Sequence, residues 1–152
     1  MDKWDHRFME MARLVSTWSS CYTANRAIGA VVVKDKRVMT TGYNGAPAGI
    51  RTCKDKAGCL RRERNIPSGT HAEICYAVHA EQNAVVQAAK LGISIDGATM
   101  YCTHQPCSVC AKIIINAGIR RIVYEQGYPD PFALDLFSEA GVTLEKYEVP
   151  AQ

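Results

Sequence analysis

The pattern of apolar and polar positions in the N-terminal part of the chain predicts one helix and one hairpin. From Trp4 to about Ser20, apolar residues recur every three or four positions, as on the buried face of an amphipathic helix. These residues are Phe8, Met11, Ala12, Val15 and Trp18. The runs AIGAVVVKD and RVMTTGYN are rich in β-forming residues and lie on either side of a polar DK pair, so we expect two strands joined by a tight turn.

The second half of the chain alternates helical and strand-like segments. HAEQNAVVQAAKLG predicts a helix from about His79 to Leu91 that ends at a glycine, and GATMYCTH predicts a short strand. Pro106 suits the first turn of the next helix, PCSVCAKIIINAG, and IRRIVYE predicts another strand. The stretch DPFALDLFSEAGVTLEKYEV predicts a helix, a glycine turn and a last strand. This order of elements indicates an α/β layer architecture with a mixed sheet.

Between these halves lies a segment of different composition. NGAPAGIRTCKDKAGCLRRERNIPSG is rich in Gly, Pro, Lys and Arg, and it is longer than an ordinary connection. The basic run CLRRER within it is expected to be a solvated helix face or loop. We therefore expect one domain, residues 1–152, with a Cys- and His-bearing insertion at about residues 44–78.

Composition narrows the function classes. Apolar residues make up 47% of the chain and charged residues 22%, as in an ordinary globular protein. A formal charge of +3 is too small for a protein that grips long nucleic acid. The chain shows neither a signal-peptide pattern nor about 18 continuous apolar residues, so we expect a cytoplasmic protein that does not span a membrane. Seven cysteines in a reducing compartment point to metal ligation or catalysis rather than to disulfides.

Two short stretches carry candidate chemistry. Cys107 and Cys110 are three positions apart, so on a helix they share a face and can reach one ion, and the start of a helix favours thiolates. His79 begins the other predicted helix and could be a third ligand. One N and two S ligands leave a tetrahedral zinc ion with an open position for water, which is typical of a catalytic site.

Glu81 lies two residues after His79 and is the candidate proton carrier. Zinc lowers the pKa of bound water to about 7, and a nearby carboxylate can take the water's proton and pass it to a substrate. Residues two apart on a regular helix point to different sides, but this objection weakens at a helix end. Taken alone, a CxxC pair could be part of a structural zinc site or two buried thiols, and an HxE pair could be a surface accident.

The combination of the two stretches resembles a known family. H-x-E followed by P-C-x-x-C is the signature of zinc-dependent nucleobase deaminases. GYNGAP, HAEQNA, PCSVCAKIIINAGIRRIVY and YPDPFALDLFSEAGV resemble the deoxycytidylate (dCMP) deaminase branch of the cytidine and deoxycytidylate deaminase superfamily, over nearly the whole chain. The resemblance implies a three-layer fold, with a five-stranded mixed sheet and helices on both faces, and hydrolysis of dCMP to dUMP and ammonia.

The resemblance also implies roles for individual residues. His79, Cys107 and Cys110 would hold the catalytic zinc while Glu81 carries protons. Asn44 of the GYNG turn would contact the nucleotide, although it could be an ordinary turn residue. The other residues expected to line or bind substrate are Arg26, Ala80, Thr103, His104 and Tyr128. Of these, Arg26 suits a 5′-phosphate but could be a surface residue, and Tyr128 could be a loop aromatic.

Regulation and assembly follow from the same resemblance. The GYNG stretch resembles enzymes controlled by dCTP and dTTP, which implies nucleotide effectors, with a Mg²⁺ ion accompanying them, and a homo-oligomer such as a hexamer. Neither a membrane nor a nucleic acid is expected as a partner.

The long segment predicts a second, structural zinc ion. Cys53, Cys59, His71 and Cys75 would close a four-ligand site and keep the segment ordered. Alternatively, these cysteines are reduced and buried as small apolar residues. Cys21 is a competing ligand, and Cys102 lies inside a predicted strand and is expected in the core.

Rival functions remain at this stage. The first is another deaminase, acting on cytidine, guanine or transfer-RNA adenosine, although a charge of +3 does not favour transfer RNA. A riboflavin-pathway deaminase is a further possibility, but no reductase domain follows. The rival from another class is a zinc-binding module without turnover, in which Glu81 would have no role.

Overall fold

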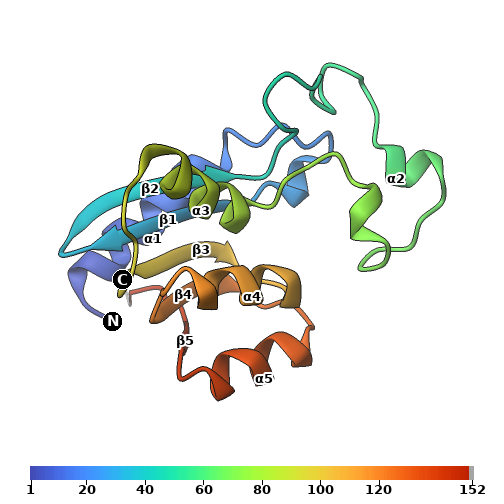
Figure 1. The fold of residues 1–152 in the computed structure, drawn as a ribbon. Coiled ribbons are helices and arrows are strands. Elements are labelled where there is room, and N and C mark those ends of the chain that lie inside the picture. Colours follow the sequence, from blue (N-terminus) through green and yellow to red (C-terminus); the bar gives the residue numbers. More distant parts are fainter. Residues whose placement is uncertain (151–152) are drawn as a thin grey trace.

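The computed structural model describes residues 1–150, in which a five-stranded sheet lies between helices (Figure 1). The strands are ordered β2-β1-β3-β4-β5. The strands are β1 (Gly29–Lys34), β2 (Arg37–Tyr43), β3 (Thr99–His104), β4 (Arg121–Gln126) and β5 (Thr143–Lys146). The α-helices are α1 (Lys3–Ser16), α2 (Leu60–Glu63), α3 (Ala80–Leu91), α4 (Ser108–Asn116) and α5 (Pro131–Glu139), and the 3-10 turns are Ala24–Arg26 and Ala72–Ile74.

The predicted hairpin and mixed sheet are confirmed. β1 runs antiparallel to β2 and to β3, whereas β3, β4 and β5 are parallel to one another. Asp35 and Lys36 join β1 to β2 with positive φ values of 51° and 60°, as a tight turn between right-twisted strands requires. The parallel strands place their carboxyl ends at one edge of the sheet, where the loops after β3 and β4 begin.

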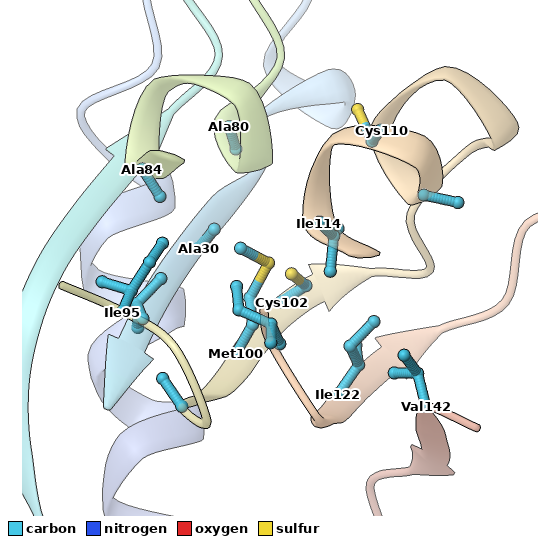
Figure 2. Close-up of a cluster of buried hydrophobic side chains, with 14 of the residues drawn as sticks. Ala30, Ala80, Ala84, Ile95, Met100, Cys102, Cys110, Ile114, Ile122 and Val142 are labelled. Atoms are coloured by element: carbon cyan, nitrogen blue, oxygen red, sulfur yellow. The ribbon is translucent and has the colours of Figure 1, made fainter. Parts of the chain in front are cut away.

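The two faces of the sheet bury different helices, as the three-layer expectation requires. Val31, Val33 and Tyr101 point to α1, because alternate residues of a strand face opposite sides. Ala30, Val32, Met100 and Ile122 point the other way, to a larger cluster with α3, α4 and α5. Figure 2 shows Ile114 of α4 directed at Met100 and Cys102, with Cys110 one turn earlier at the rim of this cluster. Cys102 is buried in the core, as expected.

The first helix is shorter than its periodicity suggested. α1 ends at Ser16, and the expectation that Trp18 lies on its buried face is wrong, because Trp18 is 52% exposed. After Ser16, the chain forms hydrogen bonds with the residue that follows β2 in place of further helical ones. The Ser19 hydroxyl and the Ser20 backbone N–H both donate to the carbonyl oxygen of Asn44, at 3.0 and 3.2 Å. Tertiary hydrogen bonding thus ends the helix before the apolar pattern does.

A charged cluster fastens α1 to the sheet. Asp5 is buried and accepts hydrogen bonds from the Tyr101 hydroxyl of β3, at 2.8 Å, and from the Arg121 guanidinium of β4, at 2.6 Å. Arg121 also reaches Glu145 of β5 at 2.6 Å. Although burial alone raises the pKa of Asp5, these hydrogen bonds lower it to about 2.

Residues 44–78, which we call the long segment, project beyond the carboxyl end of β3 (Figure 1). The segment is not a plain loop, because it contains α2 and the 3-10 turn Ala72–Ile74. Arg61 of α2 is buried, and its guanidinium donates to the carbonyl oxygens of Pro67 and His71, so it ties the segment to itself. Within the described residues, no helix is both long and apolar enough to cross a membrane.

Candidate active site

Two helix starts meet at the centre of the molecule. His79 is the N-cap of α3 and Cys107 is the N-cap of α4, while Cys110 lies in the first turn of α4. Pro106 therefore precedes the N-cap instead of occupying the first helical turn. The extended backbone of both N-cap residues, with ψ values of 152° and 171°, places their side chains at the helix ends.

These three side chains have the geometry of a metal site. The His79 Nδ1 atom lies 3.2 Å from the Cys110 sulfur and 3.6 Å from the Cys107 sulfur. A tetrahedral zinc ion with bonds of about 2.0 Å to nitrogen and about 2.3 Å to sulfur separates such ligand atoms by about 3.5 Å. The donor set therefore fits zinc. Among residues 1–150 this is the only group of three or more His, Cys, Asp or Glu residues whose ligand atoms all lie within 4.8 Å of one another.

The two thiols titrate differently. The hydrogen bond from the Cys110 thiol lowers the pKa of Cys107 to about 4, and His79 contributes in the same direction. The pKa of Cys110 is raised, first because it gives up that hydrogen bond on ionisation and then because it is buried. One thiolate is thus readily formed at the start of α4. A bound cation would favour the second, because metal ligation stabilises the deprotonated thiol.

Glu81 reaches the same point from the first turn of α3. Its side chain is buried, and its Oε2 atom lies 3.7 Å from the Cys110 sulfur. The geometric objection to an HxE pair is thus answered, because His79 is an N-cap residue with extended backbone and Glu81 is in the helix. Burial raises the pKa of Glu81, as a carboxyl group that takes up and returns a proton near neutral pH requires.

Gly42 allows α3 to begin this close to the sheet. A Cβ atom on Gly42 would overlap the carbonyl oxygen of Ala80 in the first turn of α3. Close packing against α3 thus explains the first glycine of GYNG, Gly42, and the sequence did not reveal this. Ala80 has no exposed surface and does not line the cavity described below, so the structure does not place it in contact with a substrate.

A cavity of about 300 Å³ extends from the metal ligands. Its walls include His79, Glu81 and Cys107, together with four of the residues predicted to bind substrate. These four are Arg26, Asn44, His104 and Tyr128. The structure therefore brings together residues from five separate stretches of the chain.

Asn44 holds the neighbouring wall in place. Its side-chain oxygen accepts a hydrogen bond from the Ile28 N–H at 2.8 Å, and its side-chain nitrogen donates to the Arg26 carbonyl at 2.7 Å. Asn44 is buried, so these bonds fix the backbone on both sides of residue 27. In this arrangement Asn44 positions Arg26 as well as lining the cavity.

Thr103 departs from its expected role. It is not among the residues that line the cavity, and its hydroxyl accepts a hydrogen bond from the Gly29 N–H at 3.1 Å. This bond joins β3 to the start of β1, so Thr103 is structural here. His104 does line the cavity, and burial lowers the pKa of its imidazole.

The predicted second zinc ligands do not form a group like the first. His71 is exposed, and its Nδ1 atom pairs with Glu73 at 2.9 Å, so the structure does not support it as a partner of the cysteines. Cys53 is buried, and burial is the largest cause that raises the pKa of its thiol. The charges of Cys75, Cys21 and Cys59 raise this pKa further. Cys21, Cys59 and Cys75 line the same cavity, but no three of these four cysteines have sulfur atoms that all lie within 4.8 Å of one another.

Two residues near the site escaped the sequence analysis. Asp130 accepts hydrogen bonds from the Ser108 N–H of α4 at 2.7 Å and from the Ala133 N–H of α5 at 3.1 Å, so one carboxylate caps two helices. The sequence pair Asp130-Pro131 is typical of a helix start and could have predicted that Asp130 caps α5. It could not have predicted the hydrogen bond from α4. Ser68 lines the cavity from the long segment, and nothing in its sequence neighbourhood indicated this.

Comparison with known proteins places this site in a family. The family model for the cytidine and deoxycytidylate deaminase zinc-binding region matches residues 2–126. The chain is 40% identical to ComE operon protein 2 of Bacillus subtilis over 96% of its own length and 72% of that protein. It is 37% identical to the deoxycytidylate deaminase of Schizosaccharomyces pombe over 97% of its length, but it spans only 45% of that enzyme.

A solved structure supports the same assignment. The dCMP deaminase of the cyanophage S-TIM5, solved in complex with dCMP and dUMP, superposes with a TM-score of 0.79 and 33% sequence identity. The match covers 97% of this chain and 99% of the phage protein. The fold, the His-Cys-Cys zinc-binding region and these likenesses agree, and the chain belongs to the cytidine and deoxycytidylate deaminase family.

Proposed function

We propose that this protein hydrolyses dCMP to dUMP and ammonia, and so supplies dUMP to pyrimidine deoxynucleotide metabolism. The observation that carries the proposal is the placement of Glu81 beside His79, Cys107 and Cys110 in a cavity that Arg26 and Asn44 also line. The names of the S. pombe and cyanophage relatives support dCMP as the substrate.

His79, Cys107 and Cys110 would hold the zinc ion, which when bound supplies Lewis-acid activation of water at neutral pH. Glu81 then acts as the proton carrier. It accepts a proton as water adds to C4 of the pyrimidine and delivers this proton to the ring nitrogen N3. It then takes the proton of the new C4 hydroxyl group and passes it to the amino group, so that the C4–N bond breaks, ammonia leaves and a carbonyl group remains at C4. The balance is one water consumed and one ammonia released. Burial of Glu81 keeps these transfers away from bulk solvent.

The decisive experiment replaces Glu81 by glutamine. Glu81→Gln keeps the size of the side chain but removes the acid, so we expect kcat for dCMP to fall by about 10²- to 10⁴-fold while zinc content and fold are retained. Absorbance loss measures turnover and elemental analysis measures zinc. Glu139→Gln, on an exposed position of α5, is the matched control and should leave kcat unchanged.

The same assay separates this proposal from its rivals. Wild-type protein is offered dCMP, CMP, deoxycytidine and dCTP side by side. A preference for deoxycytidine would identify a nucleoside deaminase instead. Zinc binding without turnover of any of these substrates, and without any effect of Glu81→Gln, would identify a non-catalytic module.

We also propose a second, structural zinc ion in the long segment. Support comes from Cys21, Cys59 and Cys75, which line one cavity, and from the buried Cys53, because four thiolates complete a closed zinc site. Binding would draw these sulfurs closer together than they lie here. This ligand set replaces the one with His71.

Assembly and regulation belong to the same proposal. A homo-oligomer, with a hexamer as one form, is supported by exposed aromatic residues beside the edge strand β2, where Trp18 packs edge-on against Tyr43. The GYNG turn supports control by dCTP and dTTP, with Mg²⁺ accompanying the nucleotide. We propose a single domain acting in the cytoplasm.

A further inference from the structure

Three segments that are far apart in sequence meet at the rim of the substrate cavity. Arg26 comes from the turn before β1, Ser68 from the long segment and Tyr128 from the loop after β4, and all three line the cavity. The Arg26 guanidinium donates to the Ser68 hydroxyl oxygen at 3.4 Å. The Tyr128 hydroxyl lies 3.7 Å from the position that a Cβ atom on Gly69 would take. The turn that carries Ser68 and Gly69 therefore closes against the other two segments.

This turn is held in a fixed shape. The Pro67 carbonyl oxygen accepts hydrogen bonds from the Thr70 N–H at 3.3 Å, from the Thr70 hydroxyl at 2.8 Å and from the buried Arg61 guanidinium at 2.9 Å. Gly69 has a φ of 78°, which favours glycine over any other residue. Since Arg61 also bonds the His71 carbonyl, both ends of the turn are anchored to α2. A preformed turn presents its hydroxyl at little entropic cost.

The charge around the turn favours an anion. Between residues 51 and 64 the long segment carries six basic residues and only two acidic ones. Arg61 makes its hydrogen bonds with carbonyl oxygens, so no carboxylate neutralises its charge through them. Arg26 and Ser68 together offer a charged fork and a hydroxyl, the groups that commonly bind phosphate oxygens.

We propose that the turn Pro67–Thr70 forms part of the substrate site, with Ser68 donating to the 5′-phosphate of the nucleotide beside Arg26. Ser68 is then a specificity residue that distinguishes a nucleoside monophosphate from a nucleoside, and Arg61 is a positioning residue that holds the turn. The long segment thereby contributes to recognition as well as to structure. This inference rests on the proposed deamination of dCMP.

The test replaces Ser68 by alanine and compares dCMP with deoxycytidine. A hydrogen bond from a hydroxyl to a phosphate supports about a tenfold difference in binding. We expect Ser68→Ala to raise KM for dCMP by about 5- to 10-fold with little change in kcat, and to leave kcat/KM for deoxycytidine within about twofold. Ser94 is an exposed loop serine, so Ser94→Ala is the matched control and should change neither kcat nor KM for either substrate. Titration of dUMP against deoxyuridine by calorimetry gives a readout that does not depend on turnover.

The outcomes separate this inference from the proposed function. Wild-type turnover of dCMP together with an unchanged KM in Ser68→Ala would overturn the role of Ser68 and leave the function standing. An equal loss of kcat/KM for dCMP and for deoxycytidine would also overturn this role, because replacing a purely structural residue would affect both substrates alike. A wild-type protein that neither deaminates dCMP nor binds dUMP would overturn both. The double variant Arg26→Ala/Ser68→Ala should lose less dCMP affinity than the sum of the single variants if both side chains bind one phosphate.

Discussion

At the scale of single residues, chemistry was easier to predict than position. The identity of His79, Cys107 and Cys110 as ligand types follows from their side chains and spacing, and the structure brings them together. Thr103 has a hydroxyl group that could equally well bind a substrate, yet this group accepts a hydrogen bond from Gly29 of the neighbouring strand. A side chain's chemistry is local, whereas its direction depends on the register of the strand that carries it, and the sequence around Thr103 does not set that register.

One prediction at this scale concerns Asp130. Its carboxylate caps α5 and also α4, at whose start the candidate zinc ligands Cys107 and Cys110 lie. We expect Asp130→Ala to lower the free energy of unfolding by about 1–2 kcal/mol and to hasten loss of zinc to a chelator, because the turn that holds Cys107 loosens. Denaturant titration and a chelator competition assay measure the two effects.

Asp2→Ala is the control for this experiment. Asp2 likewise accepts two backbone N–H groups, at the start of α1, far along the chain from the site. It should lose comparable stability while zinc release stays at the wild-type rate. Equal rates of zinc release in the two variants would show that Asp130 is only a helix cap.

At the scale of elements, the periodic segments were predicted well and the long segment was not. The hairpin, α3 and the parallel strands follow from apolar period and turn residues, which act over a few positions. The fold of residues 44–78 depends instead on the buried Arg61 and on contacts with distant residues, such as the hydrogen bond from the Lys54 ammonium group to the Ser19 carbonyl oxygen. Such contacts leave no periodic trace, so the sequence did not show that His71 is exposed and pairs with Glu73.

The long segment also carries a prediction about metal content. With the second site formed by Cys21, Cys53, Cys59 and Cys75, purified protein should contain close to two zinc ions per chain. Cys53→Ser should reduce this to one and make the segment more sensitive to limited proteolysis, because metal ligation stabilises the folded segment. Elemental analysis provides the count.

Cys102→Ser is the comparison for that measurement. Cys102 is buried in the core, so its replacement costs stability but should leave the zinc count unaltered. One zinc ion in the wild-type protein, unchanged in Cys53→Ser, would rule out the second site.

At the scale of the whole molecule, the acid stability should depend on Asp5. Its pKa in the folded protein is about 2, below its ordinary value of 3.8. A depressed carboxyl pKa adds stability that is fully present above the unfolded-state value and is lost as the pH falls through the folded-state value. The contribution of Asp5 is therefore present above pH 4 and disappears between about pH 4 and pH 2.

Asp5→Asn tests this dependence. We expect the variant to lose about 2 kcal/mol of unfolding free energy at pH 7, because the Arg121 guanidinium loses its buried anionic partner. The difference from wild type should shrink as the pH falls to 2. Urea denaturation across this range measures it, with Asp135→Asn, at an exposed position of α5, as the control. A difference that is the same at pH 2 and pH 7 would contradict the assigned pKa.

The meeting of two helix starts at the metal ligands also affects the durability of the folded chain. His79 caps α3 while Cys107 and Cys110 begin α4, so one ion would bind two helices that the chain connects only through a turn and a strand. An ion that prefers the folded over the unfolded chain shifts the equilibrium in proportion to the logarithm of its free concentration. Metal supply in the cell would then govern how long each molecule survives, as well as how fast it works.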